Sequence, residues 1–222
     1  MPPQAFGSAA VFYVPTKSFA GRRRTVTSDH DACLTRTMAS TLIHAFVLLV
    51  LLPAWLLVGL GDWWCHRRTR IEDTAGPRES ALHLALAGEA AVAVLPALFF
   101  EINALILVVI VVAFVAHELT TTLDFHIATP ARSITPLEMR LHDYLTAIPF
   151  ASMLLIFATH TEQALAIFGA GSENADWGLR WKSPQLPLSY LVVWLLAAGC
   201  LNITPFLEEF LRCLRVSYAK KE

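Results

Sequence analysis

The chain has few charged residues for its length. Of its 222 residues, 16% are Asp, Glu, Lys or Arg and 55% are hydrophobic, whereas a soluble domain carries about 25% charged residues. The deficit falls in discrete blocks, and long uncharged blocks are typical of an integral membrane protein. The net charge of −1 adds little, because in membrane proteins the placement of Lys and Arg is what carries information.

Three further features that the sequence lacks narrow the range of possible functions. The four cysteines are scattered with no C-x-x-C spacing, which gives no reason to expect a disulfide framework or a thiolate zinc site. No basic or acidic run is long enough to suggest nucleic acid as a partner. No glycine-rich nucleotide motif occurs, so an oxidoreductase of this sequence would take its electrons from a separate donor.

Five apolar blocks are each long enough to cross a bilayer core as a helix, which takes about 20 residues. They cover residues 41–61, 80–100, 102–123, 141–159 and 186–206, with a very tight turn at Glu101 between the second and the third. Proline is tolerated in membrane helices, so the prolines inside these blocks predict kinks rather than breaks. The fold class that follows is an all-α integral membrane bundle of about five transmembrane helices.

The two ends of the chain are polar. Residues 1–36 show no sustained apolar periodicity and are predicted to be a disordered tail, and Met38 is an alternative start of translation just before the first apolar block. Residues 37–210 are the predicted transmembrane domain, and residues 211–222 the predicted cytoplasmic tail. Near that boundary Glu208 precedes Arg212 by four residues, which is a favourable pairing on a helix.

The basic residues orient the bundle. The loops after the first and third helices and the C-terminus hold most of them: Arg67, Arg68, Arg70, Arg78, Arg132, Arg140, Arg212, Arg215, Lys220 and Lys221. The positive-inside rule puts this face in the cytoplasm. The arginines of the N-terminal tail argue against this orientation unless translation starts at Met38. We expect the bilayer to be the bacterial inner (plasma) membrane.

The pattern P-x-E-x-x-x-H occurs twice, as Pro77 to His83 and as Pro136 to His142. Each copy opens an apolar block and follows a block that ends in its own acid and histidine. Residues four or seven apart project from one side of an α-helix, so each of four helices can aim one carboxylate and one imidazole at a shared interior. All four pairs fall on the predicted cytoplasmic face: Asp62 and His66, Glu79 and His83, His117 and Asp124, and Glu138 and His142.

Such groups are costly in hydrocarbon unless something binds them. Four histidines and four carboxylates are enough for two divalent ions, and mixed imidazole and oxygen ligands suit iron best here, with zinc or manganese as alternatives. We therefore predict that four of the five helices form a metal-binding bundle with these eight residues as ligands. The alternative is local, because a Glu at the third position of a helix, as in Thr135-Pro136-Leu137-Glu138, can simply cap it.

Several other polar residues have predicted roles of their own. Glu89 lies near the middle of the second block, where a carboxylate is functional by default, so we assign it a catalytic role as a proton relay, metal-supporting group or substrate contact. His126 is a candidate extra ligand, and Glu118 is expected to make packing or loop contacts. Glu208 and Glu209 are expected on a salt-bridged surface, and His44 is expected to be structural.

The leading hypothesis is a membrane-embedded di-metal, most simply di-iron, oxidoreductase that acts on an apolar small molecule, lipid-like or quinone-like. Resemblance to membrane desaturases and hydroxylases is generic only, since their H-x-x-x-H and H-x-x-H-H boxes are absent. Three alternatives stay open. They are a zinc-dependent membrane hydrolase, a haem b electron carrier with axial histidines, and an ion or proton transporter that uses Glu89.

Overall fold

The computed structural model describes residues 20–220, and over that range the chain is helical and contains no strand. Five helical segments are long and apolar enough to cross a membrane. They are Leu34–Thr69, Pro77–Phe99, Ala104–Ala131, Pro136–Thr159 and Leu188–Ala219. The predicted all-helical fold, with five helices long and apolar enough to span a membrane, is confirmed for the described residues.

The chain divides into two compact units, residues 1–41 and 42–222. The predicted disordered tail falls in the first unit, and its residues 1–19 lie outside the described residues. From Ala20 onward the chain is the helix α1 (Ala20–Phe46), so the helix begins well before the predicted boundary at residue 36. The candidate site lies entirely in the second unit.

The elements after α1 alternate long helices with short turns. They are a π-helical turn (Val47–Leu51), α2 (Leu52–Thr69), a 3-10 turn (Ile71–Asp73), α3 (Pro77–Phe99), α4 (Ala104–Ala131), α5 (Pro136–Thr159), α6 (Thr161–Ala166), α7 (Leu188–Ala198), a second π-helical turn (Gly199–Ile203) and α8 (Thr204–Ala219).

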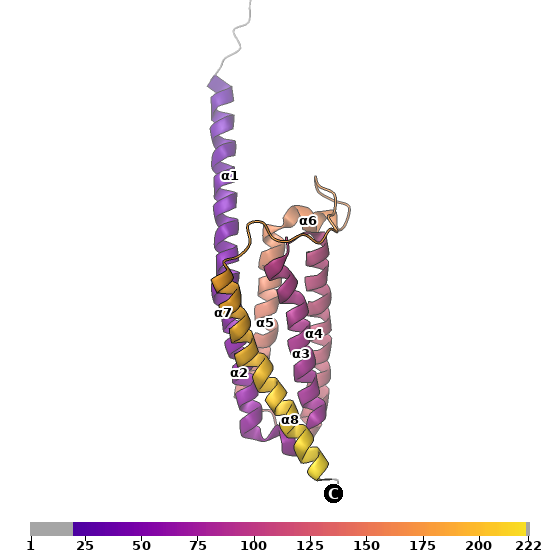
Figure 1. Ribbon diagram of the computed structural model, residues 1–222. Coiled ribbons are helices and arrows are strands. Elements are labelled where there is room, and N and C mark those ends of the chain that lie inside the picture. Colours follow the sequence, from indigo (N-terminus) through magenta and orange to yellow (C-terminus); the bar gives the residue numbers. More distant parts are fainter. Residues whose placement is uncertain (1–19, 221–222) are drawn as a thin grey trace, which may run out of the picture. The chain divides into compact units, whose positions relative to one another are not determined.

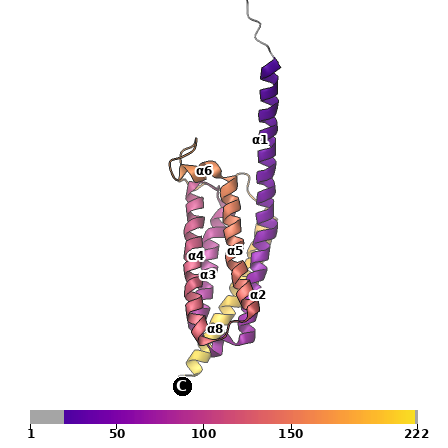
Figure 2. The ribbon, with the colours of Figure 1, turned by 180° about the vertical axis from the view of Figure 1, so that it is seen from behind.

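Within residues 42–222, the helices α2, α3, α4 and α5 lie side by side, and α8 packs across α3 and α2 (Figures 1 and 2). Short connections bring four helix ends together at one end of this bundle. These are the C-terminal ends of α2 and α4 and the N-terminal ends of α3 and α5. The C-terminus of α8 is at the same end (Figure 1), so five helices contribute residues to one layer.

The helices that reach this layer are longer than their apolar blocks. α2 continues to Thr69, α4 to Ala131, and α3 and α5 begin at Pro77 and Pro136. The acid and histidine pairs therefore lie inside regular helix rather than in loops. α8 likewise continues past residue 210, where a tail was predicted, and Cys213 on it is fully buried.

Proline shapes two of the spans. Pro53 and Pro205 each lie two residues after a π-helical turn. Proline has no N–H to donate, and its ring crowds the carbonyl four residues back, so the preceding turn widens while the helix continues. This agrees with the expectation that the prolines kink the helices without ending them.

The second π-helical turn holds Asn202 close to α2 at Gly59. The Asn202 amide donates to the Leu56 carbonyl oxygen at 3.1 Å, and a Cβ at position 59 would lie 2.1 Å from Asn202 Oδ1. Gly59→Ala should therefore displace Asn202 and lower the free energy of unfolding by about 1 kcal/mol, the worth of one hydrogen bond. Thermal unfolding in detergent measures this. The double variant Gly59→Ala with Asn202→Ala should lose no more stability than Asn202→Ala alone, and additive losses would contradict the assignment.

Candidate metal centre

Seven of the eight predicted ligands meet at the shared end of the bundle. All are buried, none with more than 8% of its surface exposed. They are Asp62 and His66 on α2, Glu79 and His83 on α3, Asp124 on α4, and Glu138 and His142 on α5. The two P-x-E-x-x-x-H copies therefore contribute both their acids and their histidines to one cluster.

The seven residues form three overlapping groups that could each hold a metal ion. One group is His66, Glu138 and His142, and a second is Glu79, His83 and Asp124. The third joins Asp62 to both His66 and His83. The first two groups are called the two half-sites, and Asp62 lies between them because it neighbours one histidine of each. Its Oδ1 is 3.1 Å from His142 Nε2 and its Oδ2 is 3.6 Å from His66 Nε2.

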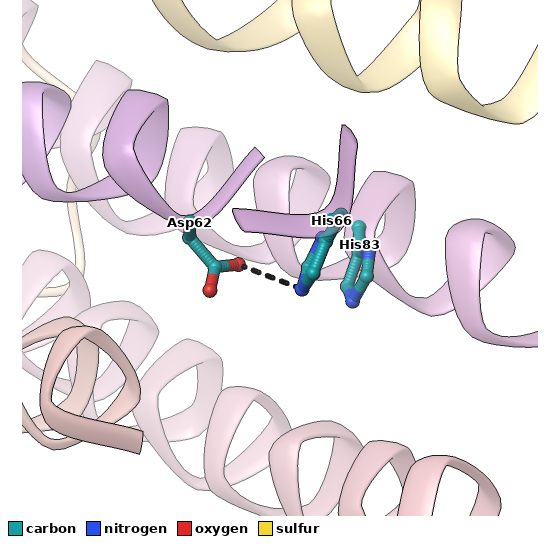
Figure 3. A group of neighbouring side chains, drawn as sticks. All are labelled: Asp62, His66 and His83. Carbon is teal, nitrogen blue, oxygen red and sulfur yellow. Dashed lines mark ion pairs between the residues drawn. The ribbon is translucent and has the colours of Figure 1, made fainter. Parts of the chain in front are cut away.

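The rings of His66 and His83 stack, with centroids 4.3 Å apart and planes 11° from parallel. Figure 3 shows the two rings face to face, with the Asp62 carboxylate directed at His66. Because the rings are stacked, their Nε2 lone pairs run side by side. They would therefore bind two separate metal ions rather than one shared ion. The spacing between the rings is close to the 3.5–4 Å that separates the ions of two-metal enzymes.

One carboxylate holds both rings from behind. Glu209 on α8 is fully buried; its Oε2 is 3.2 Å from His66 Nδ1 and its Oε1 is 2.7 Å from His83 Nδ1. Metal-binding histidines usually donate their second ring N–H to a carboxylate, which fixes the ring's orientation and tautomer. The expectation that Glu209 lies on a salt-bridged surface is wrong. It holds only for Glu208, which pairs with Arg67 and Arg212.

Distances on the Nε2 side fit ligands of a shared ion. His66 Nε2 is 3.3 Å from Glu138 Oε1, and His83 Nε2 is 3.4 Å from Asp124 Oδ1. With bonds of about 2.0–2.2 Å to the ion, two neighbouring ligand atoms are about 3–3.5 Å apart. Neither Nε2 atom has a hydrogen-bond partner among the described residues, so both are directed at the space between the acids.

Arg132 lies at the end of the cluster nearest the loop between α4 and α5. Its guanidinium bonds to Glu79 and to Glu138, and its side chain is 4% exposed. Burial alone would lower the pKa of Arg132, but the hydrogen bonds to Glu138 and Glu79 outweigh burial and raise that pKa above its ordinary value. Arg132 is therefore a fixed positive charge. The sequence does not predict this role, because the positive-inside rule alone accounts for an arginine in this loop.

The layer holds more acids than bases. With the five buried carboxylates ionised and the imidazoles neutral, one buried guanidinium would leave four negative charges; the acids are Asp62, Glu79, Asp124, Glu138 and Glu209. Buried charges are stable only when they are paired or coordinated. Two divalent ions with neutral histidines would balance the charge, whereas protonation of all three imidazoles would leave one negative charge.

Glu138 and Glu79 differ in their local roles. Thr135 and Glu138 form the predicted capping box, with Glu138 N donating to Thr135 Oγ1 at 3.2 Å, and yet Glu138 also faces His66. The N-cap of α3 is Gly76, which offers no side-chain cap, and the Glu79 carboxylate accepts hydrogen bonds from Arg132 while it also lies in the cluster. Capping is thus real at one copy of the repeat and does not exclude a place in the cluster.

The prediction for His117 is not supported by its position. His117 belongs to none of the three groups of described residues that could hold a metal ion. It shares a helix face with Asp124, but seven residues of α-helix span about 10 Å along the axis. His117 instead lies with Glu89, whose Oε2 is 3.7 Å from His117 Nδ1. The seven-residue spacing predicts that His117 and Asp124 share a face of α4, but it does not place them at the same depth in the bundle.

His126 and Glu118 are not part of the cluster either. His126 is exposed and its ring bonds back to the Thr122 carbonyl. Glu118 is half-buried on the adjacent face of α4. His44 is expected to be structural. Its Nε2 is 3.5 Å from Thr159 Oγ1 and its ring lies edge-on to the ring of His160, so its contacts are with residues outside the cluster.

An apolar cavity of about 270 Å³ leads to the cluster. Its walls include Trp55, Leu86, Ala90 and Trp194, and Asp62, His83, Asp124 and His142 lie at its surface. A second cavity of about 100 Å³ shares Trp55, Ala90, Val94 and His117 with the first. Ligand pockets are mainly apolar with a few placed polar groups, so this cavity fits an apolar molecule that meets the cluster from within the bundle.

No family model, curated protein or solved structure matches the chain. Function must therefore be inferred from the geometry of the cluster and the cavity. The rings of His66 and His83 stack directly on each other and leave no room for a haem between them, so these two histidines could not be its axial ligands.

Proposed function

We propose that this protein is a membrane-embedded di-metal oxidoreductase, with iron as the preferred metal, that acts on an apolar, lipid-like or quinone-like substrate. The observation that carries the proposal is the stacked pair of His66 and His83. Both rings are held by Glu209 on one side, and both face buried acids on the other. Ligands would come from His66, Glu138 and His142 for one ion and His83, Glu79 and Asp124 for the other, with Asp62 between them.

The cavity supports an apolar substrate for the proposed reaction. Its walls beside the cluster are aliphatic and aromatic, and an unactivated C–H bond is within the reach of iron chemistry with dioxygen. A hydroxylation would consume one dioxygen, two electrons from a separate donor and two protons. One oxygen atom would enter the substrate and the other would leave as water.

The protein's own residues divide the work in this proposal. Asp62, His83, Asp124 and His142 face the cavity, so the substrate would approach the centre from their side. Arg132, Glu79 and Glu138 lie toward the loops, where the guanidinium holds the two glutamates in place. Trp55 and the alanines of α3 would position the apolar chain and exclude water.

Metal stoichiometry tests the proposal. The detergent-purified protein should hold two metal ions per chain, measured by elemental analysis together with an optical spectrum. His142→Ala and Asp124→Ala alter one half-site each and should each lower the count toward one. Asp62→Ala, which affects both half-sites, should lower it further. Removing the metal with a chelator should also lower the melting temperature, because ions that bind only the folded chain stabilise it.

His126→Ala is the matched control, since His126 is an exposed histidine only two residues from Asp124. It should leave the count at two. A count near zero in the wild type would sink the metal centre, and a count unaffected by all three cluster variants would place the metal elsewhere.

A zinc-dependent hydrolase is the second candidate, because pairs of metal ions at this spacing also activate water for hydrolysis. The same measurement separates the two. Iron with a visible absorption band and product formation that requires dioxygen support the oxidoreductase. Two zinc ions with no colour, together with cleavage of a lipid ester or amide, support the hydrolase.

A further inference from the structure

Glu89 and His117 form a polar pair inside the bundle that the metal centre does not use. Glu89 Oε1 accepts a hydrogen bond from Thr120 Oγ1 at 2.7 Å. Its other oxygen, Oε2, and His117 Nδ1 are both buried and have no hydrogen-bond partner among the described residues. These two atoms are 3.7 Å apart, which is too long for a hydrogen bond between them.

The pair lies where the two cavities meet. His117 lines both cavities, Glu89 lines the smaller one, and the His117 side chain is 10% exposed. Polar atoms buried without a hydrogen bond cost free energy, so an unsatisfied acceptor and an unsatisfied ring nitrogen on residues that line the cavities point to a ligand atom. A hydroxyl can donate to Glu89 Oε2 and accept from His117 Nδ1, whereas a carbonyl can only accept.

The distance from this pair to the metal centre is set by the helices. Glu89 is six residues after His83 on α3, which is about 9 Å along the axis, and His117 is seven residues before Asp124 on α4, about 10 Å. The cavity of about 270 Å³ covers this interval and is lined by Leu86, Ala87 and Ala90.

We propose that Glu89 and His117 form a hydroxyl-binding subsite, and that the substrate is a single-chain alcohol whose apolar part lies in the larger cavity and reaches the metal centre. The hydroxyl would then fix which carbon meets the metals, on the order of 9 Å from the oxygen. This inference deepens the proposed function and rests on it for the reacting end of the chain. Binding of the hydroxyl itself does not require the metals.

The test is a titration of the metal-free, full-length protein in detergent with two probes. One is a long-chain alcohol brominated along its chain, and the other is the brominated alkane of the same length. Bromine quenches tryptophan fluorescence, and Trp55 and Trp194 line the cavity. We expect the alcohol to bind about tenfold more tightly than the alkane, the contribution of a hydrogen bond to a charged group. Trp55→Phe together with Trp194→Phe should remove most of the quenching.

The double variant Glu89→Leu with His117→Leu should bind both probes equally while it still binds the alkane. The retained alkane binding shows that the variant is folded. Comparing the ratio of the two affinities between wild type and variant cancels the different partition of the probes into micelles. Glu118→Gln, an acid at the same depth on α4 that lines neither cavity, should keep the tenfold preference.

Equal binding of the two probes to the wild type would overturn the subsite, because the pair would then hold only water or serve the fold. Persistence of the preference in the double variant would also overturn it. If the double variant binds neither probe, Glu89→Gln decides. A preference reduced at least about threefold supports the subsite, since a neutral acceptor is weaker, and an unchanged preference overturns it. Failure of the metal centre would show in the elemental analysis and leave this titration unchanged.

Discussion

Glu209→Gln is expected to lower the affinity for the metal ions by about 10- to 100-fold, although Glu209 would not bind them directly. The carboxylate accepts from His66 Nδ1 through one oxygen and from His83 Nδ1 through the other. An amide keeps the size of the side chain but replaces one of the two acceptors with a donor. One of the two rings must then lose its partner, and with it the fixed tautomer that leaves Nε2 free for a metal.

The measurement is competition with a chelator of known affinity, followed by elemental analysis of the protein. Glu208→Gln is the matched control. Glu208 is the neighbouring residue, has 40% of its side chain exposed and pairs with Arg67 and Arg212. Exposed ion pairs contribute little, so this variant should bind metal as the wild type does. If both variants retain the wild-type affinity, Glu209 does not support metal ligands.

Glu209 also shows what the sequence concealed. Glu208 and Arg212 are a favourable pair by their spacing, and the sequence predicts the adjacent Glu209 on the same surface. Neighbouring residues on an α-helix point about 100° apart, so one can face the surface and the other the interior. A signal was present, because Phe206, Glu209 and Cys213 follow the spacing of a buried helix face. An acid at a position where that spacing requires an apolar residue marks a functional group.

The repeat and the hydropathy pattern predict a larger part of the structure. The five spans, the shared end of four helices and seven cluster residues follow from local spacing, which helical geometry converts directly into faces and ends. The position of His117 did not follow, because spacing fixes the direction of a side chain and leaves its depth to the length of each helix. Arg132 could not be placed, since the path of a loop depends on the cluster that it packs against.

Replacing Arg132 should be the most destabilising single change in the bundle. Arg132→Met removes the one guanidinium between Glu79 and Glu138 while both carboxylates remain fully buried. Breaking a buried ion pair from one side costs about 3–5 kcal/mol, because the remaining charge is left without compensation. In a chain of this size that is a fall in melting temperature on the order of 10 °C. The melting temperature of Arg132→Lys should lie between those of the wild type and Arg132→Met. An ammonium keeps the positive charge but lacks the planar guanidinium that bonds both glutamates.

Thermal unfolding of the metal-free protein measures this effect, because bound metal would partly neutralise the same acids. Arg140→Met is the control. Arg140 lies on α5 and pairs with an acid, Asp143, but its side chain is 78% exposed, and its loss should cost under about 1 kcal/mol. The double variant Arg132→Met with Glu79→Gln should regain part of the loss, because it removes one of the two stranded charges. Equal effects of Arg132→Met and Arg140→Met would mean that the glutamates are neutral in the folded chain.

That outcome would also change the metal count. Two neutral glutamates would leave three carboxylates facing the three imidazoles and the guanidinium, and such a layer needs no divalent ion to balance its charge. The stability of Arg132→Met and the metal stoichiometry of the wild type are therefore linked through the same buried charges. A large destabilisation with two bound ions supports ionised glutamates and a di-metal centre, and a small one with no bound metal supports a proton-balanced cluster instead.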